Sequence, residues 1–140
     1  MKNLQSRSGC PISYSLDFIG DKWSLLIIRD MIFSDKKSYN EFLDSDEGIA
    51  TNILGNRLKF LESEGFIIKR DSPIKKSKKN YFLTEKGIAL IPIIFEMVLW
   101  GKRFSPTENQ NKVFDEIEEN KAEYILKSQQ KLREQLKREK

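Results

Sequence analysis

The 140-residue sequence contains no histidine and a single cysteine, Cys10. Without histidine, it cannot form a zinc site of two histidines and two cysteines, or a nucleophile activated by an imidazole base. One cysteine also excludes a disulfide within the chain, which is typical of proteins from a reducing compartment. We therefore expect a protein that is not an enzyme and that uses no metal or cofactor.

Long apolar segments are also lacking. The longest apolar run, Ile88 to Phe95, is interrupted by Pro92 and followed by Glu96, whereas a helix needs about 20 apolar residues to cross a bilayer. The first 15 residues contain no apolar core of the kind found in signal peptides. These features predict a cytoplasmic protein with no membrane partner.

Positive charge is concentrated in one part of the chain. The net charge is only +4, and residues 105–140 contribute nothing to it, because they contain eight basic and eight acidic side chains. Residues 56–86 alone carry nine basic and four acidic side chains. Such a local field of one sign favours a polyanionic partner for this segment.

The spacing of apolar residues predicts helices in the N-terminal part. Ile12 and Leu16 lie on one face of a first helix, and Asp21 is the expected N-cap of a second. Ser38 is expected to cap a short third helix, with Glu41 completing a capping box. Lys36 and Lys37 precede this helix where a phosphate would meet its positive end, and a solvated surface turn is the alternative for these two lysines. Ser38, at the start of the helix, is a candidate DNA contact.

A fourth helix is expected from Ala50 or Thr51 to Glu64, closed by Gly65. A helical wheel gathers its polar residues in an arc of about 140°, opposite the apolar residues. Asparagine can bond adenine with two hydrogen bonds, threonine and lysine can contact bases or phosphates, and glycine allows close approach. The arc is therefore a candidate DNA-reading face, made of Thr51, Asn52, Gly55, Asn56 and Lys59.

Arg57 lies on the edge of the buried stripe of this helix, between Ile53 and Leu61. We expect its aliphatic stem to cover the core and its guanidinium to pair with a carboxylate such as Glu41. A direct DNA contact is the alternative role.

A β-hairpin is expected after the fourth helix. Two short β-prone runs, Phe66 to Arg70 and Tyr81 to Leu83, flank a lysine-rich segment of ten residues. A helix followed by a basic hairpin is typical of a winged helix-turn-helix, in which the hairpin is the wing. The predicted phosphate contacts, for which a solubilising loop is the alternative, are Lys75, Lys76, Lys78 and Lys79.

The C-terminal part carries more apolar surface than one small domain needs. A fifth helix is expected from Thr84, kinked near Pro92. Its apolar stripe includes Ile91, Phe95, Val98 and Leu99, and we expect a second subunit to cover this stripe. We expect residues 105–140 to form a charged, helical C-terminal extension to a winged helix-turn-helix domain at residues 9–104.

These motifs resemble, in order, those of the HxlR-type winged helix-turn-helix regulators. The resemblance covers residues 9–104 and rests on three segments: CPISYSLDFIGDKWSLLIIRDM, GIATNILGNRLKFLESEGFI, and YFLTEKG followed by LIPIIFEMVLWG. It implies a mainly α fold with a small β-hairpin and C-terminal dimerisation helices. It also implies a homodimeric, sequence-specific DNA-binding transcription regulator of a bacterium or archaeon that acts on a pseudo-palindromic double-stranded operator.

The resemblance adds expectations for particular residues. It implies that Ile12 and Leu16 of the first helix belong to the dimer interface, and that Cys10 is a candidate sensor of oxidants or electrophiles. The alternative for Cys10 is a small structural residue before Pro11. Ala50 departs from the family pattern, which often has serine there, and Phe60 stands at a position that is usually charged.

Three other functions compete with this interpretation. A winged helix can be a protein-protein interaction module without specific DNA binding, with the lysines facing an acidic partner. An enzyme with Cys10 as nucleophile is disfavoured, since no histidine can activate it. RNA binding is disfavoured because no exposed aromatic platform is evident.

Overall fold

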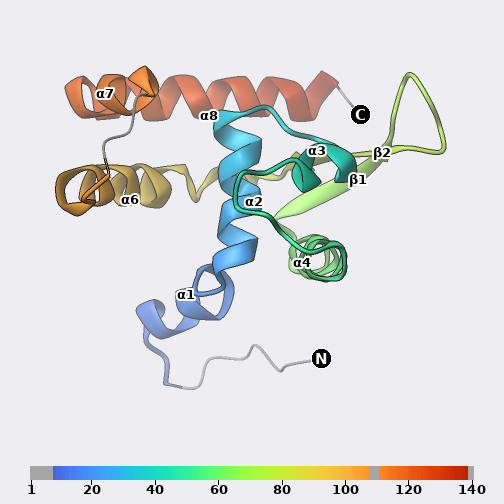
Figure 1. The fold of residues 1–140 in the computed structure, drawn as a ribbon, viewed down its shortest axis with the longest axis horizontal. Helices are drawn as coiled ribbons and strands as arrows, with labels where there is room; N and C mark the ends of the chain where they lie inside the picture. The colour runs from blue at the N-terminus through green and yellow to red at the C-terminus, as the bar shows by residue number, and fades with distance from the viewer. Residues whose placement is uncertain (1–7, 108–110, 139–140) are drawn as a thin grey trace.

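The structure, a computed structural model, describes residues 8–107 and 111–138 and contains helices and one β-hairpin (Figure 1). Helices α1 and α2 precede a helix-turn-helix formed by α3 and α4, and the hairpin follows. The elements are α1 (Pro11–Ile19), α2 (Lys22–Phe33), α3 (Tyr39–Leu43), α4 (Thr51–Ser63), β1 (Ile67–Asp71), β2 (Lys79–Leu83), α5 (Glu85–Ile88), α6 (Ile91–Phe104), α7 (Lys112–Glu119) and α8 (Lys121–Arg138). This arrangement is a winged helix-turn-helix with additional C-terminal helices, which confirms the predicted fold class.

Local side-chain hydrogen bonds start the N-terminal helices. The Asp21 carboxylate accepts from the backbone N–H of Ser24 at 2.9 Å and caps α2. Ser38 and Glu41 form the complete capping box of α3, each side chain accepting from the other residue's backbone N–H. Both caps agree with the sequence prediction. They satisfy N–H groups that a helix leaves without an internal partner in its first turn.

The hairpin is longer than the sequence predicts. Strands β1 and β2 pair in antiparallel register, from Ile67 opposite Leu83 to Asp71 opposite Lys79. The connecting loop is therefore residues 72–78, and Lys79 lies in a strand rather than in the loop. An ion pair between Lys79 and Asp71 across the strands favours this extension.

The hairpin is also joined to the helix-turn-helix. An isolated β-bridge links Ser38 to Asn80, and the Tyr81 N–H donates to the Lys37 carbonyl at 2.7 Å. The segment before α3 thus pairs with β2 outside the two-stranded sheet. These bonds attach the wing directly to the N-terminal end of α3.

The predicted kinked helix after the hairpin is instead two helices. Helix α5 ends at Ile88, and α6 begins at Ile91 with Pro92 in its first turn. Proline fits there because first-turn N–H groups have no helical acceptor, whereas inside a helix its ring would disrupt the hydrogen bonds. The chain breaks before Pro92, so no kink is required.

The C-terminal extension folds back on the rest of the molecule. Helices α7 and α8 run alongside α6 and across one end of α2 (Figure 1). Ile117 of α7 and Leu132 of α8 belong to the same core as the winged domain. The aromatic ring of Phe33 stacks on Phe95 and meets Phe114 edge-on, with centroids 5.7 and 5.6 Å apart. The extension therefore completes the core.

This packing corrects part of the predicted dimer interface. Ile91 and Phe95 are both 0% exposed, since α7 and α8 pack against α6 and Phe33 of α2 stacks on Phe95. They are core residues of one subunit and are not available to a partner. Separately, the described residues contain no helix that is both long and apolar enough to cross a membrane.

The buried position of Ile117 gives a test of the role of the extension. Ile117→Ala should lower the free energy of unfolding by about 2–5 kcal/mol, because it leaves a cavity in a shared core. Leu126→Ala, on α8 at a side chain that is 67% exposed, should change it by less than about 0.5 kcal/mol. Urea denaturation of both variants checks this, and equal small effects would contradict a structural role of the extension.

Candidate nucleic-acid interface

Helix α4 presents the predicted polar arc at the surface. Thr51, Asn52, Asn56 and Lys59 are exposed, and Gly55 between them is half-buried. The opposite face is buried, through Leu54, Leu58 and Leu61. A Cβ atom built on Gly55 would meet nothing within 4 Å, so packing within the chain does not require glycine there. The absence of a side chain at Gly55 leaves the backbone of α4 open to close approach by a ligand.

A hydrogen bond from α3 holds the first turn of α4. Ala50 occupies the N-cap position and makes no side-chain cap, as its departure from the family pattern implies. The Tyr39 hydroxyl donates instead to the Thr51 carbonyl at 3.0 Å and joins α4 to α3. Sequence reasoning missed this function of Tyr39, because the bond links residues of different helices.

Arg57 takes the structural role that was predicted, but with a different partner. Its Nη1 lies 3.3 Å from Oδ2 of Asp21, the cap of α2, and not beside Glu41. Glu41 is already occupied by the backbone N–H groups of Lys37 and Ser38. The guanidinium also lies over the Phe60 ring, 4.9 Å from its centroid, which gives this unusual Phe60 a packing role.

The Asp21 carboxylate has a lowered pKa, which keeps it charged opposite Arg57. Partial burial acts to raise the pKa of Asp21, but hydrogen bonds from Ser24 and Arg57, with the charge of Arg57, hold the pKa below its ordinary value. The pKa of Glu41 is lowered similarly: partial burial opposes the shift, and bonds from Lys37 and Ser38 outweigh it. Both side chains are therefore ionised at neutral pH.

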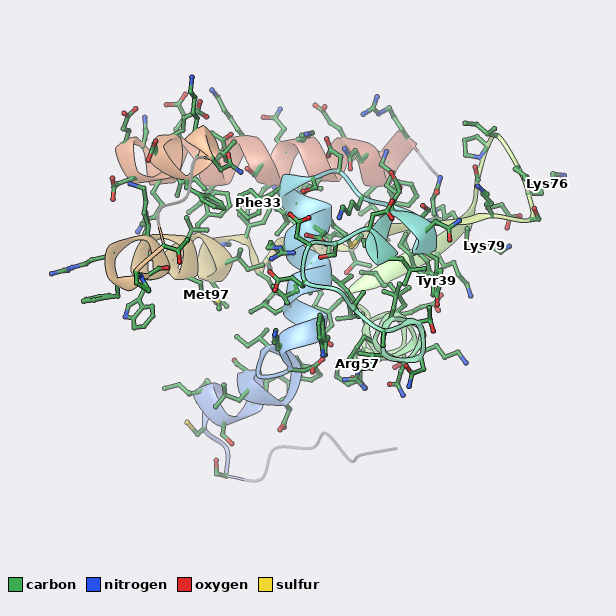
Figure 2. All side chains as sticks on the ribbon, in the orientation of Figure 1. Phe33, Tyr39, Arg57, Lys76, Lys79 and Met97 are labelled. Atoms are coloured by element: carbon green, nitrogen blue, oxygen red, sulfur yellow. The ribbon has the colours of Figure 1, made fainter. Side chains whose placement is uncertain are left out.

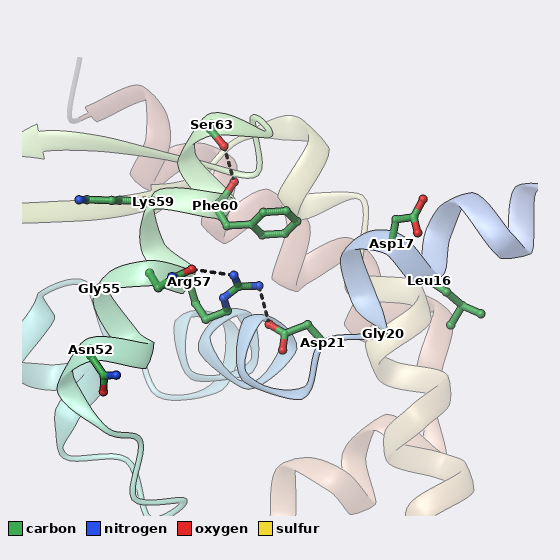
Figure 3. A pocket seen from close by; sticks show the side chains of 11 residues that line it. Leu16, Asp17, Gly20, Asp21, Asn52, Gly55, Arg57, Lys59, Phe60 and Ser63 are labelled. Carbon is green, nitrogen blue, oxygen red and sulfur yellow. Dashed lines mark hydrogen bonds and ion pairs between the residues drawn. The ribbon is translucent and has the colours of Figure 1, made fainter. Parts of the chain in front are cut away.

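An open groove adjoins the reading face. It runs between the end of α1 and the outer side of α4 (Figure 3). Apolar Leu16 and Phe60 line it together with charged side chains and the asparagines of α4. The lining residues are Leu16, Asp17, Gly20, Asp21, Asn52, Gly55, Asn56, Arg57, Lys59, Phe60 and Ser63. The groove makes the reading face part of a larger concave surface.

The wing presents three of its four predicted lysines on the connecting loop. Lys75, Lys76 and Lys78 are exposed there, and backbone bonds from Lys78 to Lys75 and from Ser72 to Lys78 give the loop a defined turn. Figure 2 shows Lys76 at the outer end of the loop and Lys79 closer to the sheet. Lys79 differs from the other three because Asp71 partly neutralises its charge.

Lys36, Lys37 and Ser38, which precede α3, already make contacts within the chain. Lys36 pairs with the buried carboxylate of Asp30 at 3.6 Å, and the Lys37 ammonium lies over the Phe82 ring. The Ser38 hydroxyl accepts the capping bond of α3. In β1, the Nε atom of Arg70 is buried and has no hydrogen-bond partner among the described residues. Sequence reasoning did not single out Arg70.

A second surface is apolar and is formed by α1 and α6; at Leu16 it meets the groove beside α4. Ile12 and Leu16 of α1 are exposed, whereas Val98 and Leu99 of α6 are half-buried. An exposed row on α6 consists of Ile93, Met97, Trp100 and Phe104. The sequence prediction placed Trp100 with the dimer stripe but missed Ile93, Met97 and Phe104. The signal was the spacing of these four residues along one helical face. Figure 2 shows Met97 on the side of α6 that faces away from α7 and α8.

Cys10 occupies the N-cap position of α1, with an exposed, free thiol. Its backbone carbonyl accepts from the Tyr14 N–H at 3.0 Å and starts the helix. The side chain makes no capping hydrogen bond to α1. The thiol is therefore open to reagents from solvent.

Comparison with known proteins gives consistent matches. The profile of the family described as HxlR-like helix-turn-helix matches residues 18–109. The HTH-type transcriptional regulator YybR of Bacillus subtilis (strain 168) is 33% identical over 131 residues, covering 93% of this chain and 97% of YybR.

Solved structures agree with this result. The redox regulator HypR in its oxidized form has a TM-score of 0.61 and 33% identity, covering 70% of this chain and 100% of HypR. The reduced form of the transcriptional regulator YodB from B. subtilis has a TM-score of 0.57 and 30% identity, covering 73% of this chain and 100% of YodB. Both structures share the winged-helix part of the fold.

Proposed function

This chain belongs to the HxlR-like helix-turn-helix family of transcriptional regulators. We propose that it is a homodimeric, cytoplasmic regulator that binds a pseudo-palindromic operator in double-stranded DNA. The observation that carries the proposal is the joint placement of two surfaces. An exposed polar face on α4 stands beside a lysine-rich wing, and a β-bridge at Asn80 and a hydrogen bond at Tyr81 join the wing to the helix-turn-helix.

The two surfaces divide the work of binding. Thr51, Asn52 and Lys59 reach outward from α4 and contact base edges in the major groove. Lys75, Lys76 and Lys78 contact phosphates, which adds affinity without sequence information. Ser38 contributes at the N-terminal end of α3, and Gly55 lets the helix approach the DNA.

Substitutions on the two surfaces should therefore have different effects on DNA binding. Asn52→Ala should cost roughly 1–3 kcal/mol at particular operator positions, while Lys76→Ala should weaken operator and random DNA alike and reduce the salt slope by about one. Binding titrations on an operator selected from genomic fragments, at several salt concentrations, measure both. Equal losses for Asn52→Ala on both DNAs would contradict the reading face. Absence of duplex binding by the wild type would favour a protein-protein interaction module.

The apolar surface supplies the second part of the proposal. Helices α1 and α6, which carry the exposed apolar side chains, lie on the same side of α2 (Figure 1). Trp100 is 69% exposed and pairs with Phe104 at 5.2 Å between ring centroids. Contiguous exposed aromatic and aliphatic side chains are typical of subunit interfaces. We place a second copy of the chain here, with Ile12, Leu16, Val98 and Leu99 contributing.

A charge in the middle of this surface should separate the subunits. Trp100→Asp should give monomers, because each interface would then bury two unpaired carboxylates, and operator affinity should fall with the loss of one half-site contact. Sedimentation velocity at micromolar concentration measures the state. Leu126→Asp, at an exposed apolar position of α8, is the control and should remain dimeric. A monomeric wild type would refute the dimer.

Redox or electrophile response is the third part of the proposal. It is supported by the exposed Cys10 thiol at the start of α1 and by similarity to the redox regulator HypR. Modification of Cys10 would place bulk or charge beside Ile12 and Leu16 and change the spacing of the two recognition helices. With one cysteine in the chain, a disulfide requires the second subunit or another thiol.

Cys10→Ser tests the response directly. Wild-type operator affinity should change after mild diamide or quinone treatment, while Cys10→Ser should keep its affinity, because the nucleophilic sulfur is gone. Operator titrations before and after treatment measure this, with circular dichroism as the control for folding. Identical behaviour of the two proteins would make Cys10 a structural residue.

A further inference from the structure

The two asparagines of the reading face stand in different chemical situations. Asn52 is exposed, and its amide makes no hydrogen bond with the described residues around it. The Oδ1 atom of Asn56, in contrast, accepts from Nη2 of Arg57 at 2.7 Å. The amide of Asn56 is therefore oriented before any DNA binds, whereas that of Asn52 is free to turn.

Arg57 is itself held from two further sides. Its other terminal nitrogen, Nη1, donates to Asp21 at 3.3 Å, and the guanidinium rests over the Phe60 ring (Figure 3). Asp21 is fixed in turn by the N–H and hydroxyl of Ser24 in the first turn of α2. A continuous chain of contacts thus runs from the start of α2 to the amide of Asn56.

The chemistry of the guanidinium decides which end of the amide faces it. The arginine side chain has only donors, so the Asn56 atom that faces it must be the amide oxygen. If the amide were turned by 180°, its –NH2 group would face the guanidinium N–H groups, donor against donor. The amide –NH2 is consequently the end left for DNA. An oxygen already held by a charged donor is also a poorer acceptor for a second hydrogen bond.

We propose that Arg57 is a positioning residue that makes Asn56 a hydrogen-bond donor to bases, instead of the two-bond partner of adenine that asparagine otherwise forms. This inference rests on the proposed DNA-binding function. Adenine and guanine both offer N7 as an acceptor in the major groove, and cytosine offers a donor. Asn56 then reads a base that offers an acceptor, without distinguishing adenine from guanine, and rejects cytosine, while Asn52 keeps the ability to select adenine.

Base-preference profiles test the assignment. The operator position contacted by Asn56 is located as the one whose preference disappears in Asn56→Ala. There, exchange of adenine and guanine should change wild-type affinity by less than about threefold, and cytosine should weaken it by about tenfold. In Arg57→Met, which keeps an apolar stem but has no donor, adenine should become preferred over guanine by about fivefold. The position contacted by Asn52 should keep its profile and is the control.

A second measurement needs no DNA and covers the case in which Arg57→Met is destabilised. Side-chain NH2 relaxation by NMR should show the Asn56 amide restricted and the Asn52 amide mobile in the wild type. Equal mobility of the two amides would overturn the inference.

The outcomes separate the inference from the proposed function. Selective operator binding with the same profile in wild type and Arg57→Met would overturn the positioning role alone. A wild-type protein without preference for any duplex would overturn both.

Discussion

The burial of one face of α6 determines how the C-terminal half is arranged. This helix carries apolar side chains around most of its circumference, so no single neighbour can cover it. Helices α2, α7 and α8 enclose Ile91 and Phe95, and the aromatic contacts of Phe33, Phe114 and Tyr124 are built around that enclosure. The opposite face is left exposed, which is why the apolar surface of the molecule lies on α6 and α1.

Interactions between near neighbours in the sequence were predicted correctly. The caps at Asp21 and Ser38 depend on residues three positions apart, and the presence of the hairpin, though not its full length, follows from local β-prone runs. The face of α6 that is buried could not be predicted, because periodicity marks apolar faces without saying which neighbour covers each one. The YybR alignment covers 93% of this chain, so it extends into α8, although the family profile ends at residue 109.

The same distinction applies to the candidate site. The helical wheel correctly placed Asn52, Asn56 and Lys59 at the surface, because side-chain direction follows from helix geometry. It also placed Arg57 at the edge of the core, but the partner proved to be Asp21, 36 positions away. The direction in which a side chain leaves a helix is a local property, whereas the residue that it contacts depends on tertiary packing. Tyr39 was missed for the same reason.

The attachment of the hairpin to α3 has a consequence for the nucleic acid. Because the Ser38–Asn80 bridge and the Tyr81–Lys37 bond join the hairpin to the helix-turn-helix, the distance between the loop lysines and the outer face of α4 is set by the protein. In a complex, the duplex must supply the adjustment of groove width and curvature. The energy of that adjustment varies with base sequence, so base pairs that no side chain touches contribute to the choice of operator.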